Sequence, residues 1–336
     1  MYLLPAWKKK WTAGAITVFA LIFILMFNVT YSGATDITLS AAALSGSATY
    51  SDGKISTPKN ILADTAFIEA GYNNVFIVKS DGTVWAWGSN SIGTLGDGPD
   101  SSGRQYPVQL RGANGVGYLT DVVALYSYFW RNYALKSDGT VWAWGSNSSN
   151  ELWIGSEYTN ASYPMQVRGA GGIGYLTNIT AIAAGNSRSA ALKSDGTVWT
   201  WGSNISISTV ATVSGNPLQN VTSICAGGFH GLGLKSDGTV WTWGSNITAG
   251  ATSYYPLGYT TSAVYTRQVG DINGATAVAA TNYHSFVLKS DGTVWTWGDT
   301  ASPVQLPDLT NTVAISSGPN FILALKSDGT VRRYNL

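Results

Sequence analysis

The chain has few charges, two histidines and one cysteine among its 336 residues, and each scarcity excludes a class of protein. A single cysteine, Cys225, cannot close an intramolecular disulfide or build a thiolate metal site. Only 11% of the residues are charged, and 19 Lys and Arg stand against 18 Asp and Glu, so the basic excess that binds nucleic acid is missing. His230 and His284 have no carboxylate cluster near them in the sequence, so neither a metal nor another cofactor is predicted. Packing alone must therefore stabilise the fold.

The sequence motifs of common enzyme classes are missing as well. The chain contains no nucleophile elbow, phosphate-cradling loop, zinc-binding helix or cysteine paired with a histidine. The most regular carboxylates, of which Asp81 is the first, belong to a repeated Asp-Gly pair that is typical of turns. We therefore predict that the chain is not an enzyme.

One long apolar run lies near the N-terminus. Lys8, Lys9 and Lys10 precede the uncharged stretch 13–29, which is the charge order of a segment that enters a bilayer with its N-terminus in the cytoplasm. Residues 1–35 are thus predicted to be a hydrophobic helix, either a signal peptide cleaved after the small residues 32–34 or a retained membrane anchor. The remainder is expected outside the cell or on its surface, anchored in the cytoplasmic membrane by residues 13–29 if these are kept.

An internal repeat organises the rest of the chain. The sequence Lys-Ser-Asp-Gly-Thr-Val begins at six places, which are Lys79, Lys136, Lys193, Lys235, Lys289 and Lys326. The first five copies continue into Trp-x-Trp-Gly, and these take ten of the fourteen tryptophans. Each copy predicts a β-hairpin, because Asp-Gly accepts the positive φ angles of a two-residue type I′ turn. Around Asp195 and Gly196 that turn would place Leu192 opposite Trp199.

The tryptophan-rich face of such a hairpin predicts a closed ring of repeats. A lone hairpin cannot hide this face from water, so neighbouring repeats must cover it on both sides. We expect residues 36–336 to form one all-β domain, a β-propeller of seven blades, or of six if the degenerate hairpin from Tyr50 to Ile55 only completes the last blade. Closure would occur between the termini, with residues 37–43 as a candidate strand.

The repeat also resembles a known family. Ala-Leu-Lys-Ser-Asp-Gly-Thr-Val-Trp-x-Trp-Gly-Ser-Asn, preceded by Ala-Ala-Gly, is similar to the repeat of the regulator of chromosome condensation family, and the resemblance covers residues 43–336. It implies a propeller that binds other molecules. The family includes nuclear exchange factors for small GTPases and exported bacterial propellers such as secreted beta-lactamase inhibitors. The N-terminal segment favours an exported member.

Variable loops lie between the Ala-Ala-Gly segment and the Leu-Lys-Ser segment of each repeat. By the resemblance, these loops gather on one face around the central channel, where Tyr, Trp and Arg are typical of binding hot spots. The candidate binding residues are Tyr72, Asn74, Tyr126, Tyr128, Phe129, Trp130, Arg131, Arg188, Phe229, His230, Tyr283, His284 and Phe321. The alternative is that the aromatic residues plug the channel mouth or pack between blades, and that the two histidines tie their loops by hydrogen bonds.

The sequence therefore predicts an exported or membrane-tethered propeller that binds a protein or a cell-surface polymer through one loop face. A structural surface component that associates with copies of itself is the alternative, and a glycan-active enzyme is a third reading.

Overall fold

A computed structural model describes residues 64–336, apart from residues 187, 203–204, 210–214, 250–251, 259, 261–265 and 319, together with two short strands before residue 57. The predicted N-terminal helix and the candidate strand at 37–43 lie outside the described residues. Within the described part of the chain, no helix is long and apolar enough to cross a membrane.

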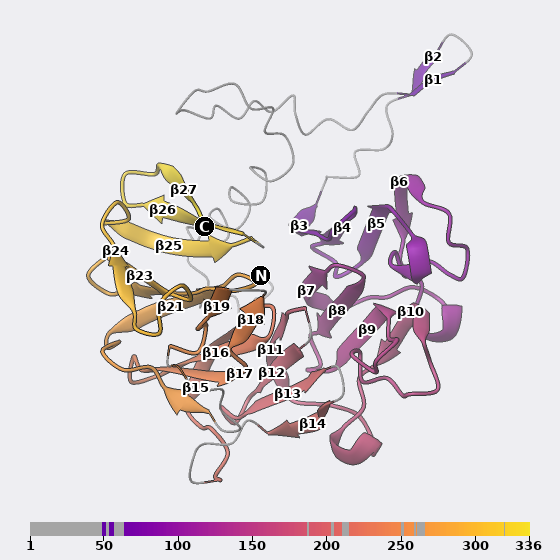
Figure 1. Cartoon of the computed structure of the whole chain (residues 1–336). Coiled ribbons are helices and arrows are strands. Elements are labelled where there is room, and N and C mark those ends of the chain that lie inside the picture. Colours follow the sequence, from indigo (N-terminus) through magenta and orange to yellow (C-terminus); the bar gives the residue numbers. More distant parts are fainter. Residues whose placement is uncertain are drawn as a thin grey trace, which may run out of the picture.

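Six antiparallel sheets fan around one axis, in the order of the sequence (Figure 1). Sheets one to five have four strands and sheet six has three. The first strand of each sheet contacts the first strand of the next, so these strands line the axis. They are β3 (Thr65–Ala70), β7 (Val122–Tyr128), β11 (Ile179–Ala184), β15 (Val221–Ala226), β21 (Ala275–Ala280) and β25 (Thr312–Ser317). The expected all-β propeller is thereby confirmed.

The remaining strands of each sheet follow outward. The second strands are β4 (Asn74–Lys79), β8 (Arg131–Lys136), β12 (Arg188–Lys193), β16 (His230–Lys235), β22 (Ser285–Lys289) and β26 (Phe321–Lys326). The third strands are β5 (Val84–Gly88), β9 (Val141–Ser146), β13 (Val198–Gly202), β17 (Val240–Gly244), β23 (Val294–Trp297) and β27 (Val331–Asn335). The outermost strands are β6 (Arg104–Gln109), β10 (Asn160–Gln166), β14 (Ile205–Thr209), β20 (Arg267–Gln268) and β24 (Val304–Leu306).

Short elements lie outside these six sheets. The hairpin predicted from Tyr50 to Ile55 is present as β1 (Thr49–Ser51) and β2 (Lys54–Ser56), which pair with each other. A second hairpin, β18 (Ile247–Ala249) with β19 (Thr252–Tyr254), is inserted before the last strand of sheet four. Three 3-10 turns are η3 (Ser91–Gly93), η4 (Ala113–Gly115) and η5 (Ala170–Gly172). The blade count is six or seven, depending on how the β1–β2 hairpin is counted.

The register of the repeated hairpin differs from the prediction by one residue. Leu192 pairs with Val198 and not with Trp199. The N–H of Lys193 donates to the carbonyl of Thr197 at 2.9 Å, so the loop between these two residues has three residues instead of two. Because side chains alternate along a strand, Trp199 lies on the same face as Lys193 and not with Leu192.

The longer loop has a conformational reason. A two-residue type I′ turn needs positive φ at both central residues, whereas only Gly196, at φ 78°, takes the left-handed region. Asp195 instead uses its carboxylate, which accepts the N–H and the hydroxyl of Thr197 at 2.9 and 2.6 Å. An Asp with a Gly after it therefore favours a three-residue loop here, and hydrogen bonds hold that loop closed.

In the second to fifth copies of the repeat, the two tryptophans have different surroundings. The first is half-buried beneath the repeat lysine, as where the ammonium of Lys193 lies 5.3 Å from the ring of Trp199. The second fills the space between sheets: Trp144 is fully buried, packs edge-on against Phe76 of the preceding sheet at 5.9 Å and donates to the carbonyl of Thr94 at 3.1 Å. Aromatic packing between neighbouring sheets thus holds the ring together.

Backbone hydrogen bonds also join neighbouring sheets at the end of the strands where the Asp-Gly turns lie. In the first joint, the N–H of Val122 in sheet two donates to the carbonyl of Gly82, the turn glycine of sheet one, at 3.1 Å. Equivalent bonds recur at the next four joints between the described sheets. The repeated Asp-Gly turn therefore closes a hairpin and also fastens it to the next sheet.

Candidate binding surface

The turns between the first and second strands lie at one end of the sheets, and we call the surface that they form the loop face. Most of these turns have two residues between hydrogen-bonded neighbours, as where the N–H of Gly71 donates to the carbonyl of Asn74 at 2.9 Å. Tyr128 and Arg131 are paired in the same way in sheet two. The strands thus fix where each turn begins and ends, and the turn residues are left to vary.

An aromatic cluster covers sheets one and two on the loop face. Tyr72 stacks on Phe129 at 5.1 Å, and Phe129 also contacts Tyr128 at 5.0 Å and Trp130 at 6.3 Å. Tyr72 is 62% exposed and Trp130 is 50% exposed, while the two rings between them are half-buried. The structure brings these four of the candidate residues together, and we call them the aromatic cluster.

Tyr128 crosses the mouth of the central channel. Its hydroxyl donates a short hydrogen bond to Oδ1 of Asn282, which belongs to sheet five. Burial raises the pKa of Tyr128 to about 12, so the hydroxyl stays protonated and keeps its donor at neutral pH. Tyr128 therefore links sheet two to sheet five across the ring, and its ring also packs against Phe129.

A second group of rings lies over sheets four and five. Tyr283 stacks on Tyr254 at 4.7 Å, and His284 meets the same ring edge-on at 5.9 Å. His284 is nearly buried, and its Nε2 lies 3.0 Å from Oδ1 of the exposed Asp299. The repeat could not predict Tyr254, because that residue comes from the inserted β18–β19 hairpin, which the other repeats lack.

The candidate arginines are partly buried. Arg131 is 3.9 Å from the carboxylate of Glu151, and both side chains are mostly buried. Arg188 is half-buried, and burial lowers the pKa of its guanidinium from the ordinary value. Phe321 is half-buried under the guanidinium of Arg333, which lies 4.5 Å from the ring centre. Arg131 and Arg188 therefore reach the surface only in part, whereas Arg333 is exposed.

Besides His284, two of the candidate residues are buried. Asn74 is 5% exposed and His230 is fully buried, so neither contacts a partner directly in this conformation. His230 binds the neighbouring sheet and not its own loop: its Nε2 is 2.9 Å from Oγ of Ser285, which itself donates to the carbonyl of Pro256. Since the serine hydrogen is used on Pro256, Nε2 must be the protonated nitrogen of a neutral ring. Phe229, the neighbour of His230, is half-buried.

Two ionisable side chains, Glu69 and Tyr126, come from the neighbouring inner strands β3 and β7. Oε1 of Glu69 accepts the N–H of Ser127 at 3.1 Å, and the Glu69 carboxyl lies close enough to Tyr126 for their charges to interact. Burial raises the pKa of Glu69 to about 8. Tyr126 keeps 38% of its surface exposed along the channel and does not belong to the aromatic cluster. Among the described residues, no group of three His, Cys, Asp or Glu side chains could hold a metal ion.

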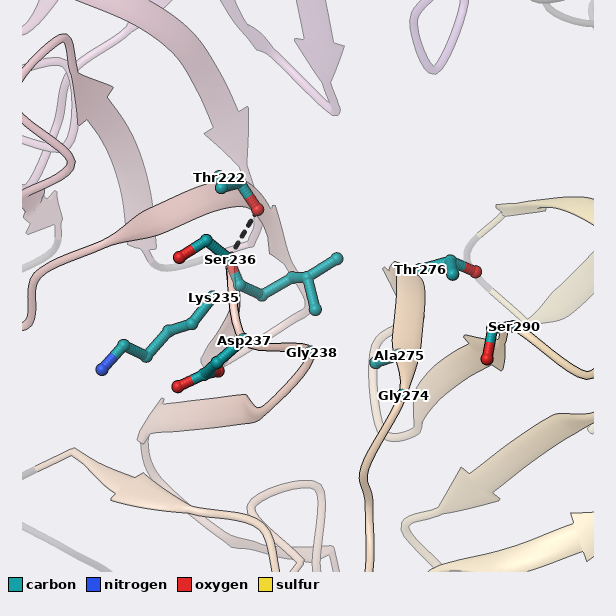
Figure 2. A pocket seen from close by; sticks show the side chains of 10 residues that line it. Thr222, Lys235, Ser236, Asp237, Gly238, Gly274, Ala275, Thr276 and Ser290 are labelled. Atoms are coloured by element: carbon teal, nitrogen blue, oxygen red, sulfur yellow. Dashed lines mark hydrogen bonds between the residues drawn. The ribbon is translucent and has the colours of Figure 1, made fainter.

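A pocket lies at the Asp-Gly turn of sheet four, at the end of the sheets opposite the loop face. Figure 2 shows the residues that line it. The pocket separates the turn at Asp237 and Gly238 in sheet four from Gly274 and Thr276 at the start of β21. In the other sheets the residue equivalent to Gly274 is Asp or Asn with a similar positive φ, so a side chain is missing here. The pocket is thus a gap in the contact between two blades.

Family models match the repeats themselves. Models of the regulator of chromosome condensation (RCC1) repeat match residues 66–93, 179–206, 221–248 and 275–301, and a related model matches residues 81–124 and 138–192. Together these matches cover more than half of the chain. The chain belongs to the RCC1 repeat family. The predicted resemblance is therefore confirmed at the level of the family.

Curated relatives share the RCC1 repeats but are longer. The human probable E3 ubiquitin-protein ligase HERC6 is 31% identical over 41% of this chain and 13% of the ligase. The mitochondrial RCC1 domain-containing protein RUG3 of Arabidopsis thaliana is 29% identical over 45% of this chain and 32% of the relative. The chain thus spans less than a third of either relative, and the ligase activity of HERC6 is not carried over to it.

Solved RCC1 structures share the fold of the chain. Yeast RCC1 (Prp20), in its crystal structure with Kap60, has a TM-score of 0.65 and 17% identity over 83% of this chain and 71% of that one. Human WBSCR16 has a TM-score of 0.62 and 17% identity over 80% of this chain and 75% of the human one. At such low identity, the likeness establishes the propeller and nothing about its partner.

Proposed function

We propose that this RCC1 propeller is a binding module that recognises a protein through the aromatic cluster of its loop face. The observation that carries the proposal is the pair Tyr72 and Trp130, which lie on either side of Phe129 and keep half or more of their surface exposed. Rigid aromatic side chains bury much area at little cost in rotamer entropy, which is why they dominate binding hot spots.

The relatives support a protein as the partner. Yeast Prp20p, another RCC1 propeller with a TM-score of 0.63, has a crystal structure reported with its binding properties to Gsp1p and histones. A partner of this chain would bury Tyr72 and Trp130 together, while Tyr128 keeps the channel mouth closed beneath it. The contact would therefore be a surface patch and not an insertion into the channel.

We also propose that the propeller acts outside the cytoplasmic membrane. The support is the sequence alone, in which Lys8 to Lys10 precede the uncharged stretch 13–29. Protease added to intact cells should cleave the propeller if this is correct. Protection until the cells are lysed would place it in the cytoplasm and contradict the proposal.

Affinity capture from native cells tests the binding surface. The full chain should retain a protein partner that the double variant Tyr72→Ala, Trp130→Ala loses by at least about tenfold, since two hot-spot side chains are removed. The matched control is Tyr118→Ala with Tyr175→Ala, which removes two comparably exposed rings from the opposite face.

Two results would contradict the proposal. Retention of every partner by the loop-face variant would show that the aromatic cluster does not bind. Capture of copies of the same chain and nothing else would favour the structural, self-associating component.

A further inference from the structure

Two neighbouring connections of the ring carry nearly the same insert. Residues 111–120 join β6 to β7, and residues 168–177 join β10 to β11. Each insert is followed at once by a residue whose carbonyl accepts an N–H from an Asp-Gly turn, Asp121 in one case and Asn178 in the other. The inserts, which we call the twin loops, therefore lie at the end of the ring opposite the loop face. The proposed protein-binding function does not use them.

Each twin loop is closed by its own backbone. Arg111 bridges to Tyr118, and the N–H of Gly112 donates to the carbonyl of Gly117 at 3.1 Å. Gly117 has a φ of 62°, and nothing lies within 4 Å of the place where a side chain would be. The second loop repeats this pattern, with a bridge from Arg168 to Tyr175. Backbone contacts thus close both loops, so they present their tips at little cost in entropy.

The loop tips expose aliphatic side chains to water. Val116 is 79% exposed and Ile173 is 83% exposed, the highest values among the large apolar side chains of the described residues. Tyr118 and Tyr175 are 49% and 59% exposed. A single exposed valine needs no explanation, but the same exposed tip in two adjacent repeats is a shared surface feature.

The side chains of each loop change in character from its tip to its base. The aliphatic side chain is at the tip. The tyrosine and the arginine are at the base, where the guanidinium of Arg111 is 5.2 Å from the ring of Tyr118. Neither loop contains a carboxylate, although Arg168 pairs with Glu157 of the same sheet. A lipid leaflet presents the same order, with hydrocarbon inside, an interface that favours tyrosine, and phosphates that attract arginine.

We propose that the twin loops dock on a lipid bilayer, with Val116 and Ile173 in the outer hydrocarbon and the tyrosines and Arg111 at the headgroups. A lipid surface fits better than a protein partner because each tip is one aliphatic side chain flanked by glycine, and such side chains are under-represented in protein hot spots. Two loops of equal design give two points of contact at the end opposite the loop face, so docking leaves the loop face turned away from the membrane.

Site-specific fluorescence tests this docking in the full chain. A polarity-sensitive nitrobenzoxadiazole label is placed at Val116→Cys or Ile173→Cys in a Cys225→Ala background, with vesicles of phosphatidylcholine and phosphatidylglycerol. The control label is Asn73→Cys, an exposed position on the loop face. We expect a blue shift and a severalfold rise in emission at both tips and no change at position 73. The label reports its own surroundings, so the N-terminal segment does not affect the result.

A second variant tests whether the loops act together. Ile173→Asp should remove more than half of the emission change at position 116, because each loop alone binds weakly. Unchanged emission at both tips, or an equal change at position 73, would overturn the proposal. A response of the tips to a soluble protein extract but not to vesicles would also overturn it, in favour of a protein partner.

Discussion

One tyrosine lies at a position where the other five sheets have a small residue. Tyr128 is in register with small residues of the other sheets, which are Gly71, Gly185, Gly227, Thr281 and Gly318. Its side chain therefore has room to cross the channel mouth and meet Asn282. The sequence indicated that the loop around Tyr128 was rich in aromatic residues. It could not show that one of them spans the ring, because that contact joins residues 154 positions apart.

His230 should make folding sensitive to acid. Burial, with a smaller repulsion from His284, lowers the pKa of His230 from 6.5 to about 3. The folded chain keeps this ring neutral while the unfolded chain protonates it below pH 6.5, so stability is lost as the pH falls from 6.5 towards 3. Replacing His230 with Gln should remove this loss, which is at most about 1.4 kcal/mol per pH unit. Urea titrations of both proteins between pH 7 and 4.5 measure the difference, and parallel curves would contradict the assignment.

Glu69 should act in the opposite direction. Its pKa is about 8 in the folded state and 4.5 as an ordinary carboxyl, because burial disfavours the charge. The folded chain therefore holds a proton that the unfolded chain releases, and this contribution to stability is lost as the pH rises from 4.5 to 8. Glu69→Gln should gain stability relative to the wild type across that range and then level off. Thermal melting at pH 5, 7 and 9 measures this, and a constant offset at all three would contradict it.

At the scale of elements, the repeated hairpin shows what a sequence pattern can and cannot predict. The six copies predicted the position of each turn, and the structure has a turn at each. The register was wrong by one residue because Asp195 closes the loop with its carboxylate, where a type I′ turn would need its backbone at positive φ. A pattern of residue types does not distinguish these two turns, whose difference lies in one dihedral angle.

The glycine of that turn should be hard to replace. Gly196 has a φ of 78°, and an added side chain would lie 3.2 Å from the backbone of Asn220 in the next sheet. Gly196→Ala should therefore lower the free energy of unfolding by about 1–3 kcal/mol. Gly270→Ala is the control, because that glycine is exposed, has no positive φ and has nothing within 4 Å. Equal losses in the two variants, measured by urea titration, would contradict the role of the turn conformation.

The inserted elements were beyond prediction from the repeat. Tyr254 reaches the loop face on the β18–β19 hairpin and stacks on Tyr283. The sequence between the third and fourth strands of sheet four has no counterpart in the other repeats, so the periodicity that located the loops could not locate this ring. Of the second ring group, only Tyr283 and His284 were predicted.

For the whole molecule, the sequence predicted a ring, and the described residues form most of one. Each sheet contacts the next from sheet one to sheet six, and sheet six lacks the fourth strand that the other sheets have. Within the described part of the chain, β27 pairs only with β26. Closure by residues 37–43 stays a prediction, because those residues lie outside the described part.

A deletion series tests how the ring closes. If residues 37–43 complete sheet six, a chain that starts at residue 49 should melt at a lower temperature than a chain that starts at residue 36, since an edge strand is left open. Differential scanning calorimetry compares the two, with the full chain as the reference. Identical melting temperatures would show that the strand lies elsewhere.

Hydrogen exchange of the propeller with its captured partner tests most directly whether the loop face is where it binds. The account predicts slower exchange in the complex at residues 71–74 and 128–131, which carry the aromatic cluster, and no change at the Asp-Gly turns of the opposite face. Protection at those turns with unchanged exchange at residues 71–74 and 128–131 would contradict it.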